Sequence, residues 1–301
     1  MVSAQERCEP SDTPRRMREY DSRVAQLDIG MPGKVGIIDV TLRTDRTGRT
    51  VMSEQFYQTP LQVQRVVYPD DVPARMAQIY LMSVSGGILQ GDRNRIDIKL
   101  SDEAAARILT QGATRVYSMD ASFATQMVNI TTEDGCYLEY LPHCIIPYRN
   151  ARYYQRTHIR RDGGVIICSE MLVPGRVASG ESFLYDICYL RTMYTDRSGV
   201  VKFLENQQIE PHSCNPEAMN GFSVMGTVYA FFDGTSDVEE RVVQDMDSVD
   251  GTISGTSLLP DQAGIMVRVL GRDAICGFDA VNTAVRSLRR HIPGSPFSDT
   301  A

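Results

Sequence analysis

Residues 83–117 read SVSGGILQGDRNRIDIKLSDEAAARILTQGATRVY and contain the densest group of turn residues in the chain. Three glycines, Gly86, Gly87 and Gly91, lie between an apolar run and the segment IDIKL at 96–100, where apolar and polar residues alternate. Alternation with a period of two is typical of a β-strand with one buried face. The stretch therefore predicts a strand, a glycine turn and a second strand.

A glycine-rich turn invites comparison with the loops that bind phosphate groups. Those loops open onto a helix, whose N-terminal N–H groups hold the anion, whereas here a strand follows. The spacing matches neither G-x-G-x-x-G nor G-x-x-x-x-G-K-[ST]. The glycines are better explained by positive φ angles or by close approach of two backbones. Asp92, directly after Gly91, is then presented at the end of the turn.

The chain beyond residue 35 repeats this β pattern. Short β-rich runs recur about every ten residues, separated by Gly, Asp, Asn and Pro. They include VGIIDVTL, TVMSEQFY, AQIYLMSV, QMVNITT, YYQRTHIR, VIICSE, FLYDICYLRTMY, VVKFLENQQI and FSVMGTVYAFF. Because alternating strands and helices are missing, we predict a mostly β fold, a β-helical or solenoid-like all-β domain. No fixed-period repeat is evident.

Two segments near the C-terminal part have a helical period instead. In 236–249 the apolar stripe consists of Val238, Val242, Met246 and Val249, and Ser236 with Glu239 forms a capping box. In 273–291 the stripe consists of Ile275, Phe278, Val281, Val285 and Leu288. We expect each stripe to cover an open face of the β domain.

Composition excludes several classes of protein. The 301 residues are 42% hydrophobic and 23% charged, with a net charge of −7, which is ordinary for a soluble protein and unfavourable for binding nucleic acid. The seven cysteines are scattered and never form C-x-x-C, so neither a disulfide framework nor a structural zinc site is indicated. No apolar stretch suits a signal peptide or a membrane span, and we expect a cytoplasmic protein.

We divide the chain into three parts. Residues 1–33 mix charge, proline and polar residues without an apolar period, and we expect them to be disordered or loosely ordered. Residues 34–292 form one β-rich domain, and residues 293–301 form a flexible tail.

Six segments follow one another along the chain: PLQVQRVVYP (60–69), SGGILQGDR (85–93), TQGATRVY (110–117), LEYLPHCIIPYRNA (138–151), PGRVASGESF (174–183) and GIMVRVLG (264–271). In this order they resemble the urease accessory protein D family, called UreD or UreH. The motif residues they supply are Gly86, Gly87, Gly91, Gly112, Arg115, Pro142, Gly175, Arg176, Gly180 and Glu181. Residues 1–33 do not share the resemblance.

The resemblance implies a role without catalysis. A member of this family is expected to bind apo-urease and the accessory proteins F and G, and to help deliver nickel to the urease active site. No cofactor is expected to be tightly bound, since the nickel ion is cargo in transit. The expected partners are therefore the urease structural subunits and these two accessory proteins, with no nucleic acid and no membrane.

Three carboxylates and one hydroxyl are candidates for an internal nickel route. Strand alternation places Glu170 on one face with apolar neighbours, and Glu205 alternates with Val201 and Phe203. With Asp92 and Thr114 they would supply sparse oxygen ligands, which hold nickel weakly enough to release it. These four positions also match the residues attributed to the proposed nickel passage of the family.

Alternatives remain open at this point. Each carboxylate could instead form an ion pair with an arginine such as Arg93, Arg115 or Arg176. The whole protein could be a scaffold without an ion route, or a carbohydrate-active β-solenoid enzyme using paired carboxylates such as Asp92 and Glu170.

Histidine and cysteine ligands are not favoured for a metal site. His143 and Cys144 are neighbours in sequence, and adjacent residues of a strand point to opposite faces. The segment YRNARYY at 148–154 is aromatic and basic, which suits either a protein interface or an ordinary half-exposed strand.

Overall fold

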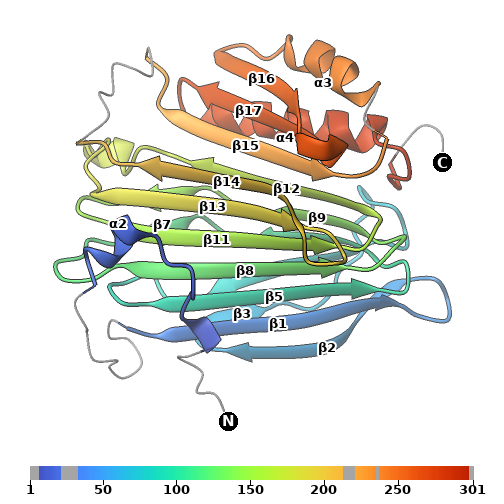
Figure 1. Cartoon of the computed structure of the whole chain (residues 1–301), viewed down its shortest axis with the longest axis horizontal. Coiled ribbons are helices and arrows are strands. Elements are labelled where there is room, and N and C mark those ends of the chain that lie inside the picture. Colours follow the sequence, from blue (N-terminus) through green and yellow to red (C-terminus); the bar gives the residue numbers. More distant parts are fainter. Residues whose placement is uncertain (1–6, 22–32, 213–220, 235–236, 298–301) are drawn as a thin grey trace.

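Two β-sheets face each other in the computed structural model, which describes residues 7–21, 33–212, 221–234 and 237–297 (Figure 1). Sheet A has the strand order β14 (Val201–Ile209), β13 (Ile187–Thr195), β11 (Arg152–Arg161), β8 (Ala124–Thr132), β5 (Arg93–Ser101), β1 (Val35–Thr44), β2 (Thr50–Gln58). Sheet B has the order β16 (Thr252–Leu258), β17 (Gly264–Gly271), β15 (Val224–Phe231), β12 (Val165–Leu172), β9 (Tyr137–Leu141), β6 (Ala105–Thr110), β4 (Ala77–Ser83), β3 (Leu61–Val63). Two short strands, β7 (Thr114–Val116) and β10 (Ile145–Pro147), pair with each other, and β10 also pairs with β12.

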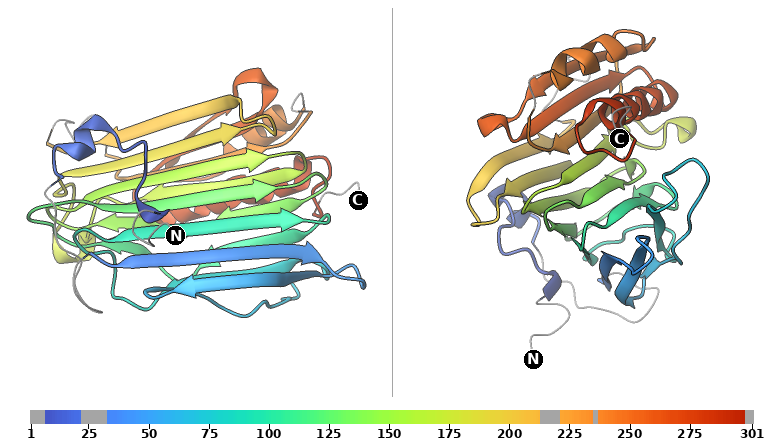
Figure 2. Two further views of the ribbon diagram at one scale, coloured as in Figure 1. Left: turned by 60° about the horizontal axis from the view of Figure 1, so that its bottom comes forward. Right: turned by 90° about the vertical axis from the view of Figure 1, so that its right-hand side faces the viewer.

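The chain winds between the two sheets as a β-solenoid. From β4 to β13 successive long strands alternate between sheet B and sheet A, and neighbours within each sheet are parallel. This gives about four coils, and the two layers are visible end-on in Figure 2. The predicted mostly β, solenoid-like fold is confirmed.

The coils differ in length. In sheet A, Arg93 pairs with Thr125, Ala124 with Tyr153, and Tyr153 with Cys188, so the offsets are 32, 29 and 35 residues. The sequence therefore contains no fixed period, although the architecture is repetitive.

Antiparallel strands close both ends of the solenoid. At one end β2 pairs with β1, and β3 pairs with β4. At the other end β14 pairs with β13, while β15, β17 and β16 extend sheet B beyond β12. The strand β16 was not predicted from the sequence.

A layer of aliphatic side chains fills the space between the sheets. Strand alternation places one face of each strand inside, and the interior includes Ile38, Ile98, Ile130 and Ile159 from sheet A with Ile79, Ile108, Leu138 and Ile166 from sheet B. Strand alternation in β12 is as expected, because Ile166 and Cys168 both point into this interior.

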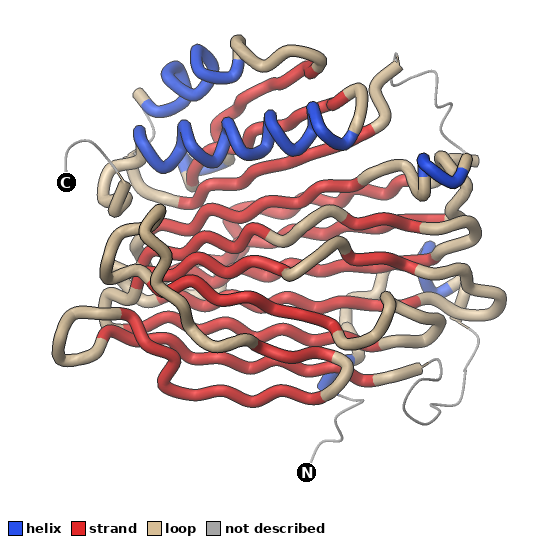
Figure 3. Tube along the Cα trace, turned by 180° about the vertical axis from the view of Figure 1, so that it is seen from behind, coloured by secondary structure: helices blue, strands red, loops and turns tan. Residues whose placement is uncertain are grey.

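Two helices cover the outer face of sheet B near the C-terminal end (Figure 3). They are α3 (Val238–Met246) and α4 (Ala274–His291), and α4 packs on β15 and β17. Asp273 caps α4 by accepting a hydrogen bond from the Cys276 N–H. Among the helices of the described residues, none combines the length and the hydrophobicity that a membrane span needs.

The predicted helical stripes need one correction. Val238, Val242 and Met246 are buried as predicted, but Ile275 is 73% exposed. The helix begins at Ala274, so Ile275 lies in its first turn, and the buried stripe starts at Gly277. Ser236 of the predicted capping box lies outside the described residues.

Both terminal segments contact the domain where the structure describes them. Residues 7–21, including α2 (Arg15–Arg18), lie across the outer face of sheet A (Figure 1). Met17 and Cys8 are fully buried there. At the other end Ser295 is 1% exposed and the Phe297 ring lies 6.2 Å from that of Tyr137. These parts differ from the loose extension and flexible tail that we expected.

Candidate functional site

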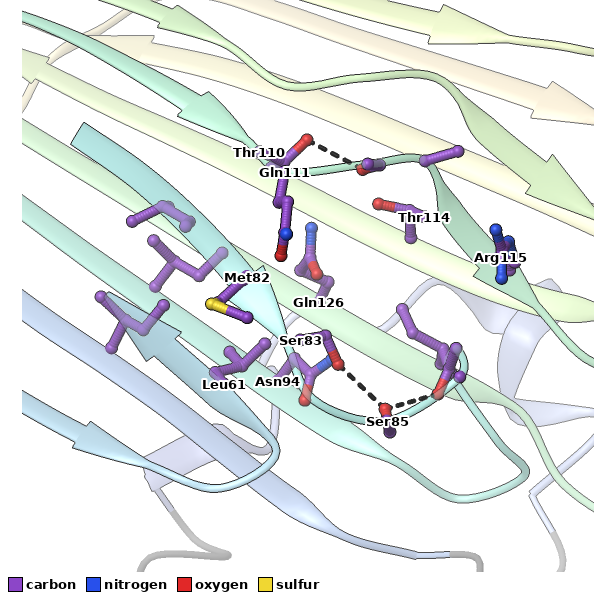
Figure 4. Close-up of a pocket in the computed structure, with 18 residues that line it drawn as sticks. Leu61, Met82, Ser83, Ser85, Asn94, Thr110, Gln111, Thr114, Arg115 and Gln126 are labelled. Atoms are coloured by element: carbon purple, nitrogen blue, oxygen red, sulfur yellow. Dashed lines mark hydrogen bonds between the residues drawn. The ribbon is translucent and has the colours of Figure 1, made fainter. Parts of the chain in front are cut away.

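A cavity of about 340 Å³ opens between the glycine-rich loop after β4 and the interior of the solenoid (Figure 4). Its apolar lining includes Leu61, Ile38 and Ile96. Its polar side chains are Ser83, Ser85, Asn94, Thr110, Gln111, Thr114, Arg115 and Gln126. The Asn94 side chain is 3% exposed, and its Oδ1 atom has no hydrogen-bond partner among the described residues. The cavity thus combines an apolar lining with polar groups, one of which is unpaired.

The glycines permit close packing of the loop. A Cβ on Gly87 would lie 2.6 Å from the Arg115 carbonyl oxygen and 2.5 Å from the Tyr117 ring. Gly91 has a φ of 74°, which favours glycine. The close backbone approach and the positive φ expected from the sequence are both present.

Asp92 stabilises the turn after β4. Its side chain accepts hydrogen bonds from the Leu89 N–H at 2.9 Å and the Lys34 N–H at 2.8 Å, and the Lys34 Nζ lies 3.6 Å away. Burial raises the pKa of the Asp92 carboxyl group, and these bonds oppose that effect. Both oxygens are thus already used by the fold.

Glu170 lies in the interior on β12 and has no ion pair in the described part of the chain. Its Oε1 accepts hydrogen bonds from Thr192 at 3.1 Å and Gln155 at 3.4 Å, while its Oε2 has no partner among the described residues. Burial raises the pKa of Glu170 to about 7. A carboxyl group near its pKa can exchange a proton for a cation at neutral pH.

A row of amide side chains leads from the cavity to Glu170. Asn94, Gln126 and Gln155 are paired positions on β5, β8 and β11, so they share the inner face of sheet A. Gln126 lines the cavity and donates to the Gln155 oxygen at 3.3 Å, and Gln155 donates to Glu170. Polar atoms therefore connect the cavity with the buried carboxyl group.

Glu205 lies beyond Glu170 on β14. It accepts hydrogen bonds from the Tyr229 hydroxyl and from Arg268, with which it forms an ion pair. The pKa of Tyr229 is raised well above its usual value by burial and by the nearby Glu170 and Glu205. Tyr229 therefore lies close to both carboxyl groups.

The four predicted route residues do not form one cluster. Thr114 lines the cavity, Glu170 lies at the end of the amide row, and Glu205 lies beyond it, whereas Asp92 is engaged in its turn. Two carboxylates do form ion pairs, but with Lys34 and Arg268 rather than with the arginines we named.

Arg93 and Arg176 instead pair with Glu9 and Glu181. Val201 also departs from prediction, because a bulge between Tyr194 and Thr195 shifts its register and leaves it 51% exposed.

The other motif residues shape loops at the ends of the coils. The Arg176–Glu181 ion pair closes the loop after β12, which contains the short helix η1 (Val177–Ser179). Gly175 and Gly180 adopt φ angles of 138° and 75° in that loop. Gly112 and Arg115 are exposed, and Pro142 is half-buried before β10.

The aromatic and basic segment 148–154 is divided by the fold. The Tyr148 and Tyr117 rings are in contact, with centroids 4.9 Å apart and planes tilted by 58°, and the Arg176 guanidinium lies 4.4 Å from the centroid of the Tyr148 ring. Tyr153 and Tyr154 are instead fully buried. The segment is therefore not an ordinary half-exposed strand along its whole length.

His143 and Cys144 require a correction. They precede β10 and lie in contact, with the His143 Nδ1 and Cys144 Sγ 3.3 Å apart, so the strand argument for opposite faces does not apply. Burial raises the pKa of the Cys144 thiol to about 11, which keeps it protonated. Across the described ranges, no three His, Cys, Asp or Glu side chains gather as a metal-binding group.

Sequence reasoning missed Gln126, Gln155 and Thr192. In YYQRTHIR the alternation places Tyr153, Gln155 and Thr157 on the same face. Polar residues on the apolar face of a strand were the available indication, but the pairing of strands was needed to align them.

Comparison with known proteins identifies relatives over most of the chain. The model of the family "UreD urease accessory protein" matches residues 35–300. Urease accessory protein UreD of Cenarchaeum symbiosum is 39% identical over 281 residues, covering 91% of this chain and 98% of the relative. UreD 3 of Methylorubrum populi is 34% identical, covering 95% and 94%, and UreD 2 of Streptomyces griseus is 30% identical, covering 90% and 94%. This chain therefore belongs to the UreD family of urease accessory proteins.

Proposed function

We propose that this protein is a non-enzymatic scaffold and metallochaperone of urease maturation. It binds apo-urease together with the accessory proteins F and G, and it passes nickel toward the urease active site through its interior. Family membership supports the role in urease maturation. The observation that carries the internal route is Glu170, a buried carboxyl group without an ion pair in the described ranges that is joined to the cavity by Gln126 and Gln155.

The chemistry of this line suits an ion in transit. Amide, hydroxyl and carboxyl oxygens are hard ligands. A small number of such oxygens binds nickel more weakly than a cluster of imidazole or thiolate groups would. Conduction requires binding strong enough for entry and weak enough for release. Nickel would displace the proton of Glu170, whose pKa of about 7 makes that exchange inexpensive at neutral pH.

The test uses cells that carry the matching urease and the other accessory genes. Urease activity and the nickel content of purified urease are compared for wild type, a deletion and Glu170→Gln. The glutamine keeps the shape and the acceptor for Thr192 but cannot become an anion. Glu133→Gln, at an exposed carboxylate, serves as the matched control.

The expected result is loss of nickel from urease in the deletion and in Glu170→Gln, while Glu133→Gln behaves as wild type. Recovery of the complex with urease and the F and G proteins shows that Glu170→Gln still assembles. If that variant loads nickel normally, the protein is a scaffold without an ion route. If the deletion leaves urease fully loaded, the proposed function is wrong.

The enzyme alternative receives no specific support. A glycosidase needs two carboxyl groups free to act on one bond, but both oxygens of Asp92 accept main-chain hydrogen bonds.

A further inference from the structure

The outer face of sheet A carries two rows of side chains that the proposed function does not use. Strand pairing aligns Arg93, Thr125, Tyr154 and Tyr189 in one row, and Arg95, Met127, Arg156 and Arg191 in the next. We call these eight residues the arginine face. Arg95 pairs with Asp97 on its own strand at 2.7 Å, whereas Arg156 and Arg191 are neighbours on adjacent strands. Like charges at such positions repel each other unless an anion lies between them, so these two arginines favour an acidic partner.

Residues 7–21, which we call the N-terminal strap, supply those anions. The Asp12 carboxylate lies between two arginines, 3.1 Å from Arg156 Nη1 and 2.9 Å from Arg191 Nη1. Glu9 pairs with Arg93 at 3.0 Å. Within the described ranges, the ion pairs of Arg93, Arg156 and Arg191 are all made to the strap.

Apolar contacts anchor the same segment. Met17 is fully buried among Phe123, Tyr154, Ile187 and Tyr189. Cys8 is likewise buried against Val35, Ile37 and Met127 at the other end of the strap. Arg16 of the strap also pairs with Glu210, outside the arginine face, at 2.8 Å. The arginine face itself therefore recognises carboxylates flanked by apolar side chains, and the strap crosses the strands as a linear ligand would (Figure 2).

The strap leaves some hydrogen-bonding groups of the arginine face without a partner in the described part of the chain. The Tyr154 hydroxyl, the Arg156 Nε and the Thr125 hydroxyl are buried, and none has a hydrogen-bond partner among the described residues. Unpaired buried polar atoms weaken an association. The ion pairs are also partly exposed, with Asp12 at 34% and Glu9 at 48%, so salt screens them.

The strap has little structure of its own. Its helix, α2, has four residues and no side-chain cap, so it would not persist away from the sheet. The arginine face lies within the part of the chain that matches the family model, residues 35–300, and the strap lies before the start of that match.

We propose that the arginine face is a docking site for an acidic segment of a partner protein, and that the N-terminal strap occupies it in cis until the partner displaces it. The partner segment carries carboxylates at the positions of Glu9 and Asp12 and an apolar side chain at the position of Met17. Charge complementarity determines this choice of occupant.

The binding test uses two fluorescent peptides and fluorescence anisotropy. One has the sequence of residues 7–21, and the second carries Arg7→Glu and Arg15→Glu at positions that form no ion pair in the described structure. The proteins are the whole chain, a chain lacking residues 1–21, and that shortened chain with Arg156→Ala and Arg191→Ala. A scrambled peptide of the same composition is the control.

The shortened chain is expected to bind both peptides, the more acidic one at least as tightly, and to lose affinity as salt increases. The whole chain is expected to bind at least about tenfold more weakly, since its own strap competes. Binding that is equal for the scrambled peptide, or that persists without Arg156 and Arg191, would overturn the proposal.

A second measurement covers the case in which the shortened chain does not fold. In the whole chain, trypsin cleavage after Arg16 and Arg18 reports release of the strap, and cleavage after Arg46 in the exposed turn before β2 is the internal reference. Asp12→Asn and an excess of the acidic peptide should each accelerate strap cleavage at least about tenfold without changing cleavage after Arg46. If neither does, the strap is a fixed part of the fold. A strap exchanged between two copies would appear as a dimer in sedimentation and would also overturn the partner assignment.

Discussion

Thr192 on sheet A and Glu170 on sheet B meet across the interior, with the Thr192 Oγ1 donating to the Glu170 Oε1 over 3.1 Å. Only one oxygen of this carboxyl group is hydrogen-bonded in the described part of the chain. Burial therefore dominates, and it raises the pKa of Glu170 to about 7. Several properties of the protein should consequently change near neutral pH.

The stability of the fold should depend on Glu170 in a defined pH window. Because its pKa is raised in the folded protein, the neutral form stabilises the fold fully below the usual glutamate pKa of 4.5, and this contribution is lost as pH rises to about 7. Glu170→Gln removes the titration, so the free energy of unfolding of the variant relative to wild type should increase by about 2 to 3 kcal/mol between pH about 5 and pH about 8. Urea denaturation at the two pH values measures this. If the difference in the free energy of unfolding between Glu170→Gln and wild type is the same at the two pH values, the prediction is contradicted. That constant difference is the result expected for the control variant Glu133→Gln.

The turn held by Asp92 should be sensitive to substitution for structural reasons. Asp92→Ala leaves the Leu89 and Lys34 N–H groups without their acceptor, which should lower the free energy of unfolding by about 3 kcal/mol. Thermal and urea denaturation of Asp92→Ala and Asp92→Asn measure the effect, and the asparagine should retain part of the stability. A stable Asp92→Ala protein would show that the turn does not need this carboxylate. Loss of function in Asp92→Ala alone would therefore not demonstrate an ion route.

The packing of helix α4 on sheet B should depend much more on Arg289 than on the adjacent Arg290. Arg289 donates to both oxygens of Glu139, at 2.6 and 2.7 Å, and Glu139 is fully buried on sheet B, where it also pairs with Arg107. Arg289→Ala should destabilise the protein by about 3 kcal/mol, since it uncovers a buried ionic network.

The adjacent Arg290 provides the control. Its side chain is 54% exposed and lies 3.9 Å from Asp245, so Arg290→Ala should have an effect within about 1 kcal/mol. Equal urea midpoints for the two variants would contradict the assignment of Arg289 as the link between helix and sheet.

Substitution by alanine should destabilise the protein at Gly87 but not at Gly112. An alanine Cβ at Gly87 would collide with the Arg115 carbonyl oxygen, whereas at Gly112 it would meet nothing within 4 Å. Gly87→Ala should cost about 2 kcal/mol, and Gly112→Ala should remain within about 0.5 kcal/mol. Chemical denaturation of both variants tests this. If Gly87→Ala is tolerated as well as Gly112→Ala, the loop can move away from Arg115.

The fold class could be predicted because local patterns determine it. Alternation in IDIKL and in the other runs, with glycine and proline between them, predicted strands without reference to their partners. The coils could not be counted, since offsets of 29 to 35 residues conceal the repeat. Strand β16 was missed because its sequence, TISGTSL, contains small and polar residues on an exposed edge.

The candidate site was predictable only in part. Glu170 and Glu205 were found because a carboxylate on an apolar strand face is unusual. Gln126, Gln155 and Thr192 are distant in sequence and meet only through parallel pairing. The partners of Asp92 and Glu205, Lys34 and Arg268, are also distant in sequence. Composition likewise gave no indication that Met17 and Asp12 would lie on sheet A.

The antiparallel strands at the two ends determine how many coils the protein has. A parallel solenoid has no inherent length, because each coil that is added leaves free strand edges on which another coil can pair. Without β14 and β15, the edges of β13 and β12 would act as templates for strands of other molecules. We therefore expect a chain that stops before β14 to polymerise, so the C-terminal strands keep the protein in finite units as well as completing the sheets.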